Sequence, residues 1–185
     1  MTQERDTNLC GALRHGRAFL LICAALLAAS EIAARGSDDI YTSFLIDDGG
    51  RLHLRLASGQ YVLAPKDRHQ VKFDTPTISK DGKTVGWLDF YPFSRADKND
   101  YDPGPIPQGL TIYRNRHILH QFGTNQIFYG WHFWHDATEV AYSVGPTHGG
   151  ISEAFLCDAQ SGKVLAHWLP GDANIPDWAE EFKEE

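Results

Sequence analysis

Histidine is the residue type that offers this sequence the most chemistry. Two pairs among the nine histidines have a spacing seen in metal sites, namely His117 with His120 and His132 with His135. Residues three apart on a strand point to opposite faces, so neither pair converges on one ion. A structural zinc site needs four ligands, and Cys157 is the only thiol near these pairs in sequence. We therefore predict no metal site and no cofactor.

A run of oxygen-bearing residues invites a calcium interpretation. It consists of Asp97, Asn99, Asp100 and Asp102. Tyr101 stands where a third oxygen ligand would be expected, and no glycine and distal glutamate follow at the spacing of a calcium loop. We interpret the run as a solvated acidic loop.

The best single candidate for a catalytic site is a histidine between glycines. His148 lies in the segment Gly-Pro-Thr-His-Gly-Gly-Ile-Ser-Glu, residues 145–153, with Asp136 or Glu153 as a carboxylate partner. A hydrolase needs a serine, a base and an orienting group within mutual reach, and the segment has no Gly-x-Ser-x-Gly elbow. We therefore favour a glycine-rich connection between two strands and assign no catalytic residue.

Aromatic residues are concentrated in residues 128–134, Phe-Tyr-Gly-Trp-His-Phe-Trp. Strand alternation places Trp131 and Phe133 on one face, and His132 and Trp134 on the other. These rings are core if both faces are covered. An open face would instead offer a stacking surface to a sugar or a peptide. The candidate ligand surface consists of Tyr129, Trp131, Trp134 and His148.

The elements that must position these residues are strands. Between residues 41 and 169, short alternating apolar runs recur between turn residues, and helical periodicity is nearly absent. The pattern predicts an all-β fold of antiparallel hairpins. We expect them within residues 52–63, 77–88, 110–119, 133–142 and 155–165.

One hairpin pattern occurs twice, starting at Ile78 and again 55 residues later at Phe133. Residues 78–87, Ile-Ser-Lys-Asp-Gly-Lys-Thr-Val-Gly-Trp, align with residues 133–142, Phe-Trp-His-Asp-Ala-Thr-Glu-Val-Ala-Tyr. A period of about 40 to 50 residues built from four short strands is typical of propeller blades. The first turn has Asp-Gly where the second has Asp-Ala, and alanine disfavours positive φ, so the second turn should be longer or of another type.

The first of these segments resembles the Ser-x-Asp-Gly-x-x-hydrophobic-Ala-aromatic signature of WD-like, TolB-type β-propeller repeats. Residues 157–163, Cys-Asp-Ala-Gln-Ser-Gly-Lys, are similar to the hairpin that closes such a blade. The resemblance implies an antiparallel meander of blade-like units, forming an incomplete propeller or an open sandwich, because propellers typically use four to eight blades. It also implies an interaction or ligand platform outside the cytoplasm. The units are expected at about 41–72, 73–125 and 126–170.

Residues 1–30 are interpreted as a signal peptide. Arg14 and Arg17 precede an apolar run of 12 residues. A membrane-spanning helix needs about 20. Cleavage after Ser30 would leave residues 31–185 as a single β domain, periplasmic or secreted, and an uncleaved membrane anchor is the alternative.

The charge of the remaining chain limits its partners. Without residues 1–30 it has 14 basic and 22 acidic residues, a net charge of −8. Nucleic acid and anionic membranes both need clustered Lys and Arg, so we expect neither as a partner. Protein or carbohydrate partners remain, and the chain is expected to be a monomer or a homodimer. Cys157 alone cannot form an internal disulfide, so the domain must be held by its core.

Two segments lie outside the hairpins. Residues 92–109 contain four prolines and are predicted to be a loop. Residues 177–183 are predicted to be a short helix with Asp177 as its N-cap and Trp178 and Phe182 on one face. We expect this helix and residues 39–46 to cover the open strand edges of a monomer.

The sequence therefore predicts an exported, non-enzymatic binding or protein interaction module built on propeller-like β repeats. A small hydrolase or carbohydrate-active protein that uses His148 remains the alternative.

Overall fold

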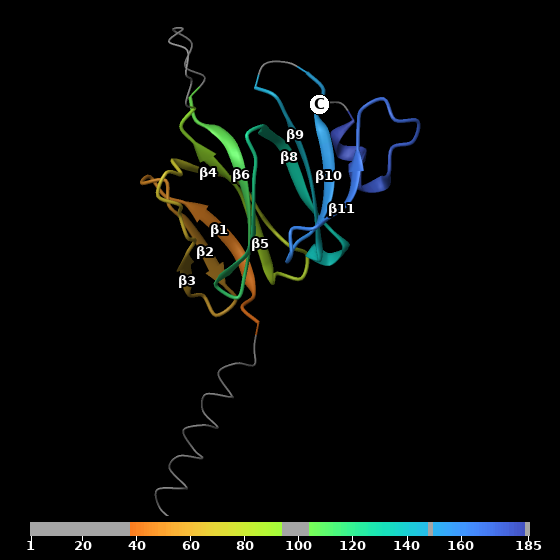
Figure 1. The fold of residues 1–185 in the computed structure, drawn as a ribbon. Coiled ribbons are helices and arrows are strands. Elements are labelled where there is room, and N and C mark those ends of the chain that lie inside the picture. Colours follow the sequence, from red (N-terminus) through yellow and green to blue (C-terminus); the bar gives the residue numbers. More distant parts are fainter. Residues whose placement is uncertain (1–37, 94–103, 148–149, 184–185) are drawn as a thin grey trace, which may run out of the picture. The chain divides into compact units, whose positions relative to one another are not determined.

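Antiparallel strands account for most of the residues that the computed structural model describes, which are 38–93, 104–147 and 150–183 (Figure 1). Two short 3-10 helices complete them, and the all-β prediction is confirmed. The elements are β1 (Tyr41–Ile46), β2 (Leu52–Leu56), β3 (Tyr61–Leu63), β4 (Lys72–Ile78), β5 (Thr84–Tyr91), β6 (Ile106–Arg114), β7 (His117–Gly123), β8 (Ile127–Trp134), η1 (His135–Ala137), β9 (Glu139–Gly145), β10 (Glu153–Asp158), β11 (Val164–Trp168) and η2 (Asp177–Phe182).

The strands form three open sheets, and each sheet uses strands that are consecutive in sequence. The first sheet has the order β1-β2-β3, the second β4-β5-β6-β7 and the third β8-β9-β10-β11. The five predicted hairpins all form, as β2–β3, β4–β5, β6–β7, β8–β9 and β10–β11. The strands and η2 belong to one compact unit that begins at Asp39.

The two matching sequence segments occupy equivalent places in the second and third sheets. Each contributes the end of the first strand, a turn and the start of the second strand, in β4–β5 and in β8–β9. The aligned residues Val85 and Val140 are both fully buried. The prediction that these segments are equivalent hairpins is therefore confirmed.

The turns of these two hairpins are of different types, as predicted, although the predicted reason, that alanine would avoid positive φ, does not hold. In the first, Asp81 accepts hydrogen bonds from the Ser79 hydroxyl at 2.7 Å and the Lys83 N–H at 3.0 Å, and Gly82 has φ +73°. In the second, residues 135–137 all have positive φ and form η1. Ala137 thus takes a left-handed conformation at the position where glycine occurs in the first turn, which costs free energy for a residue with a Cβ.

The sheets share their cores with their neighbours in the chain. One cluster joins Leu52, Leu54 and Leu56 of the first sheet to Val85, Trp87 and Tyr113 of the second. The next joins Leu88, Leu110, Ile112 and Phe122 of the second sheet to Phe128, Val140, Val144 and Cys157 of the third. The last joins Ala141, Ala154, Leu156 and Trp168 of the third sheet to Trp178, Ala179 and Phe182 of η2. Alternation along β5 explains how the second sheet serves two clusters, since Val85 and Trp87 face the first sheet and Leu88 faces the third.

Glycine at residue 86 allows the second and third sheets to pack closely against each other. A Cβ on Gly86 of β5 would lie 2.5 Å from the Trp131 ring of β8 and 3.1 Å from Ile112 of β6. The Trp131 indole N–H also donates to the Thr75 hydroxyl of β4 at 3.3 Å. The Trp131 ring therefore lies in the space that a side chain at residue 86 would otherwise fill.

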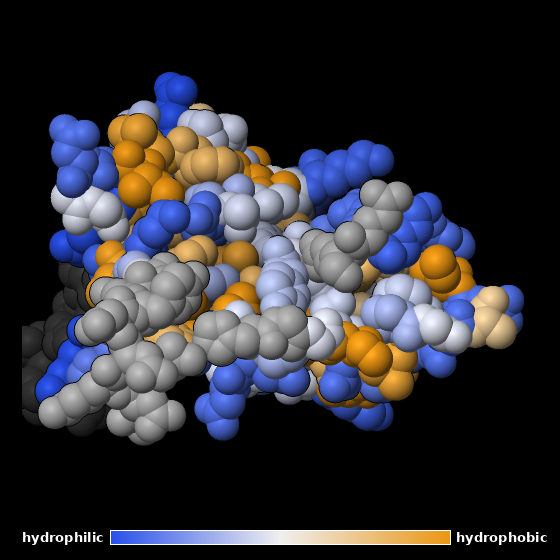
Figure 2. All heavy atoms as spheres, turned by 90° about the horizontal axis from the view of Figure 1, so that it is seen from above, coloured by the Kyte–Doolittle hydropathy of each residue, from blue (hydrophilic) through white to orange (hydrophobic). Residues whose placement is uncertain are grey.

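The surface is mixed in hydropathy. In the view of Figure 2, the apolar atoms that are not drawn in grey form several groups separated by hydrophilic ones. Among the described residues, the first sheet contributes five large exposed apolar side chains. These are Phe44, Leu45, Ile46, Tyr61 and Leu63.

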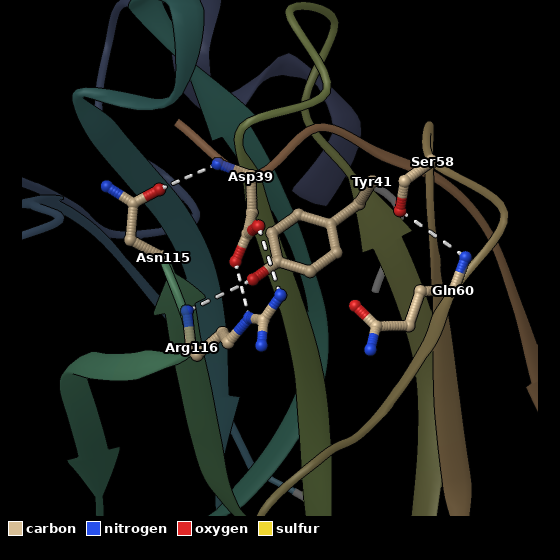
Figure 3. A network of polar contacts seen from close by, with 6 residues as sticks. All are labelled: Asp39, Tyr41, Ser58, Gln60, Asn115 and Arg116. Atoms are coloured by element: carbon tan, nitrogen blue, oxygen red, sulfur yellow. Dashed lines mark hydrogen bonds and ion pairs between the residues drawn. The ribbon is translucent and has the colours of Figure 1, made fainter. Parts of the chain in front are cut away.

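A polar network ties the start of β1 to the turn between β6 and β7 (Figure 3). The Arg116 guanidinium pairs with Asp39 at 2.8 Å, and the Asn115 side chain accepts the Asp39 N–H at 3.1 Å. The buried Tyr41 hydroxyl accepts the Arg116 N–H at 3.2 Å. Burial raises the pKa of Tyr41, so the hydroxyl stays neutral at physiological pH. The network fixes the first residues of the first sheet on the second.

The prediction of a loop over residues 92–109 is wrong at its end, because β6 already begins at Ile106. Pro107 lies within this strand, opposite Phe90, where the register of β5 and β6 shifts. A proline without an N–H is tolerated at such an irregularity. The middle of the predicted loop, residues 94–103, lies outside the described residues.

The C-terminal helix forms, but its predicted cap and position are wrong. It is a 3-10 helix whose N-cap is Pro176, and no side chain caps it. Trp178 and Phe182 pack on the face of the third sheet rather than over an edge, because Ala141 and Ala154 leave room there. Residues 41–46 likewise do not cover an edge but form one, as strand β1. Among the described residues, no helix is long and apolar enough to cross a membrane.

The contact between Gly86 and Trp131 gives a direct test of how the second and third sheets pack. Gly86→Ala should lower the free energy of unfolding by about 1–3 kcal/mol, because the new methyl group overpacks against the Trp131 ring. Gly123→Ala is the matched control, since no atom lies within 4 Å of its Cβ position. It should leave stability unchanged or raise it by up to about 1 kcal/mol. Urea denaturation measures both, and equal values for the two variants would contradict this packing.

Candidate ligand site

The residues proposed for hydrolysis are not brought together within the part of the chain that the structure describes. His148 lies outside the described residues. Glu153 begins β10, and its carboxylate lies 3.0 Å from His167 Nε2. Asp136 lies in η1, just before β9, whereas Glu153 pairs with Val144 near the end of β9. The two candidate carboxylates therefore lie toward opposite ends of the third sheet.

The histidine pairs have separate environments. The ring centroids of His120 and Phe122 lie 4.5 Å apart, while His117 lies exposed at the start of β7. The His132 ring stacks on the Phe182 ring with a centroid distance of 5.2 Å, whereas His135 Nδ1 lies 3.0 Å from Glu139 Oε2. Among the described residues, no group of three or more His, Cys, Asp or Glu side chains is placed to hold a metal ion. The acidic run at residues 97–102 lies outside the described residues.

The aromatic strand β8 uses most of its rings for packing. Trp131 faces the second sheet, where it contacts Gly86 and lies 5.1 Å from Phe133 in an edge-on arrangement. Trp134 lies on the opposite face with the residues that pack against η2. Tyr129 is 46% exposed at a bulge in β8, and its hydroxyl donates to the Pro146 carbonyl at 2.7 Å. Among these three rings, Tyr129 therefore offers the most open surface.

The second sheet holds a buried carboxylate that the sequence analysis did not single out. Asp89 of β5 is 1% exposed. Its Oδ1 accepts the Trp87 indole N–H at 2.8 Å. Its Oδ2 accepts the Thr111 hydroxyl at 2.5 Å and the Gln121 amide at 3.1 Å. The donors come from β5, β6 and β7, so the carboxylate depends on the register of three strands.

Two hollows meet at Gln121. The smaller, of about 140 Å³, is lined by Asp89, Thr111 and Gln121 and by residues 65–70 of the connection from β3 to β4. The larger, of about 520 Å³, is open to solvent. The side chains of the larger hollow include two hydroxyls and three amides. Its lining includes Tyr91, Gln108, Gln121, Gly123, Thr124 and Asn125.

Glycines keep the larger hollow open. A Cβ on Gly109 of β6 would lie 3.1 Å from Asp89 Cβ and 3.5 Å from the Tyr91 ring. Gly123 pairs with Gly109 across β6 and β7, and no atom lies within 4 Å of its Cβ position. The absence of a side chain at Gly109 makes room for Asp89 and Tyr91, and the absence of a side chain at Gly123 leaves empty space in the hollow.

The ionisable groups of the site are shifted toward their neutral forms. Burial raises the pKa of Asp89, and the hydrogen bonds from Thr111, Gln121 and Trp87 oppose this shift. Burial, followed by the charges of Asp89 and Asp67, raises the pKa of Tyr91 to about 12. The Tyr91 hydroxyl is therefore protonated at physiological pH.

This arrangement suits binding rather than bond cleavage. Both oxygens of Asp89 already accept hydrogen bonds, which leaves the carboxylate poorly placed to take a proton from a substrate. The described lining of the larger hollow has no serine, cysteine or histidine to act as a nucleophile or base. Amides and hydroxyls both donate and accept hydrogen bonds. Such a set can hold a polar, uncharged ligand.

A signal for this site was present in the sequence. Residues 85–91, Val-Gly-Trp-Leu-Asp-Phe-Tyr, place one carboxylate within an otherwise apolar strand. A buried charge is rare unless it is paired or hydrogen-bonded, so such a residue marks a special environment. The partners Thr111 and Gln121 are 22 and 32 residues away, and their sequence context gives no comparable signal.

No protein-family model matches the chain, and no curated protein matches it.

The hydrogen bonds of Asp89 should make a measurable contribution to stability. Thr111→Val keeps the shape of the side chain but removes the hydroxyl donor to Asp89. It should lower the free energy of unfolding by about 1.5–3 kcal/mol, the range for hydrogen bonds to charged groups. Thr77→Val, at an exposed position of β4, is the control and should change it by less than about 0.5 kcal/mol. Chemical denaturation at pH 7 distinguishes the two, and a Thr111 variant as stable as the control would contradict the role assigned to Asp89.

The packing of η2 should make stability depend on pH through His132. Burial lowers the pKa of His132 below its usual 6.5, and Glu181, 3.2 Å away, opposes the shift only in part. The unfolded chain therefore binds a proton more readily than the folded one, and stability should fall as the pH drops below about 6.5. His132→Phe should remove this component, so unfolding curves from pH 7 to pH 5 should diverge between variant and wild type. Parallel pH profiles would count against this assignment.

Proposed function

We propose that this protein is an exported, non-enzymatic binding module built on propeller-like β repeats, and that its larger hollow binds an uncharged, hydroxyl-rich ligand such as a saccharide. The observation that carries this proposal is the composition of the hollow. Tyr91, Thr124 and the amides of Gln108, Gln121 and Asn125 surround one opening.

The chemistry of these side chains favours a saccharide over a charged ligand. Each sugar hydroxyl donates and accepts hydrogen bonds, and an amide side chain offers both functions within one group. The Tyr91 ring adds an aromatic surface for the apolar face of a sugar. The volume of about 520 Å³ is within the range of small-molecule sites.

Export and repeat architecture are supported by the sequence. The basic residues and apolar run of residues 1–30 fit a signal peptide, which favours a periplasmic or secreted location. The equivalent hairpins of the second and third sheets support a relationship to propeller blades. A hydrolase that uses His148 with Asp136 or Glu153 is the second candidate, and the pairing of Glu153 with His167 makes Glu153 the less available partner.

Ligand binding can be tested by closing the hollow. The purified protein is titrated with a panel of neutral oligosaccharides by calorimetry. For any saccharide that binds, Gly123→Val should weaken binding at least about tenfold, or 1.4 kcal/mol. The reason is that Gly123 lines the hollow and no atom lies within 4 Å of its Cβ position, so an added side chain takes up space that the ligand would need. His117→Val, an exposed change on the same strand, is the control and should leave the affinity unchanged.

Two outcomes would overturn the proposal. One is a panel in which no saccharide binds, or binds equally well to the Gly123→Val variant. The other is turnover of ester, peptide or glycoside substrates that His148→Ala abolishes, because that result identifies the second candidate.

A further inference from the structure

The first sheet carries an unusual number of apolar side chains at its surface. Opposite the buried residues of β2, its outer face presents a row in which Leu45, His53 and Leu63 lie side by side across β1, β2 and β3. Leu45 is 57% exposed. A hollow of about 310 Å³ on this face is lined by Leu45, Asp47, His53 and Tyr61, and the His53 and Asp47 side chains pair at 2.7 Å.

The edge strand β1 extends this apolar surface to both faces of the sheet. Phe44 pairs with Leu54 and Ile46 with Leu52, on the side where these leucines are buried, yet both remain exposed. All residues of β1 after Tyr41 are exposed. An apolar edge strand with unpaired backbone groups is a template for another strand.

Three other edge strands of the described chain, β3, β4 and β8, carry features that discourage pairing. The register of β1 against β2 also shifts, between Tyr41 and Ser43, but residues 43–46 after this shift pair regularly. β3 has only three residues. β4 contains Pro76 and loses its regular register between Asp74 and Thr77. β8 has a bulge at Tyr129. The segment Thr-Ser-Phe-Leu-Ile of β1 contains neither a charged residue nor a proline. Charged residues and prolines are two of the features by which proteins protect an edge strand from pairing.

The edge strands β7 and β11 are alternatives, because both also lack acidic residues, lysine, arginine and proline. In β7 the register against β6 shifts between Ile112 and Tyr113, and among its large apolar side chains Ile118 is the exposed one. The strand β11 runs from Val164 to Trp168. Two of its five residues point into the structure, since Trp168 is buried and Ala166 is half-buried. His167 is held by Glu153 at 3.0 Å. β11 therefore exposes a shorter apolar run than β1, although Leu165 is 47% exposed.

We propose that β1 pairs antiparallel with β1 of a second copy of this chain, which joins two first sheets into one six-stranded sheet across a two-fold axis. A second copy is the occupant that fits, because an antiparallel pair of identical strands is self-complementary. The uncharged segment places apolar residues opposite apolar residues and brings no like charges together. The start of the strand is already fixed, since the Tyr41 N–H donates to the Gly82 carbonyl at 2.6 Å and its hydroxyl accepts from Arg116.

The test compares one substitution at two edges. The mass of the purified protein is measured by light scattering over a range of concentrations, for wild type, Leu45→Lys and Leu165→Lys. We expect a dimer for the wild type and for Leu165→Lys. We expect a monomer for Leu45→Lys, because each copy would bring a positive charge into the paired strands. Circular dichroism and thermal melting of both variants show whether each keeps the fold, and both changes lie at exposed positions.

Hydrogen exchange adds a readout that locates the interface. The amide protons of residues 42–46 should exchange more slowly at concentrations where the dimer forms, and Leu45→Lys should remove this protection. A wild-type monomer at every concentration would overturn the proposal, and so would a dimer that survives Leu45→Lys. A dimer lost only in Leu165→Lys would assign the interface to β11 instead.

Discussion

The close approach of Trp131 to Gly86 is the contact on which the arrangement of the second and third sheets depends. A side chain at residue 86 would occupy the space of the indole, so the two sheets can pack at this distance only because residue 86 is glycine. The same logic applies one repeat later, where Ala141 lies fully buried among the residues that contact η2. A small residue after each buried valine thus sets how closely the next layer packs.

The polar site is a product of the same layering. Trp87 and Asp89 lie on the face of β5 that is opposite to Gly86. Trp87 packs against the first sheet, and Asp89 lies next to the connection from β3 to β4. A carboxylate with three donors satisfies its hydrogen-bonding needs, yet its burial still favours the neutral form. The site therefore places rigid polar groups around a carboxylate whose two oxygens already accept hydrogen bonds, which is consistent with the binding role proposed above.

The sequence could predict what depends on neighbouring residues. Alternation and turn residues identified all five hairpins. The turn at residues 135–137 differs from the first turn, but not for the predicted reason, because Ala137 adopts the positive φ that alanine was expected to avoid. Features that depend on distant strands were missed. The start of β6 was hidden by Pro107, which a register shift accommodates. The polar site around Asp89 was missed because Asp89 meets Thr111 and Gln121 only through the pairing of three strands.

Each hydrophobic cluster is shared between two successive layers, and this has a consequence for how the chain acquires its structure. The leucines of β2 are covered only when Trp87 and Tyr113 are in place, so the first sheet cannot be stable before the second sheet exists. The second sheet in turn needs partners on both sides. Within the described residues, each sheet therefore depends on a neighbouring layer to cover its apolar side chains, and we expect the layers to assemble cooperatively around β5 and β6.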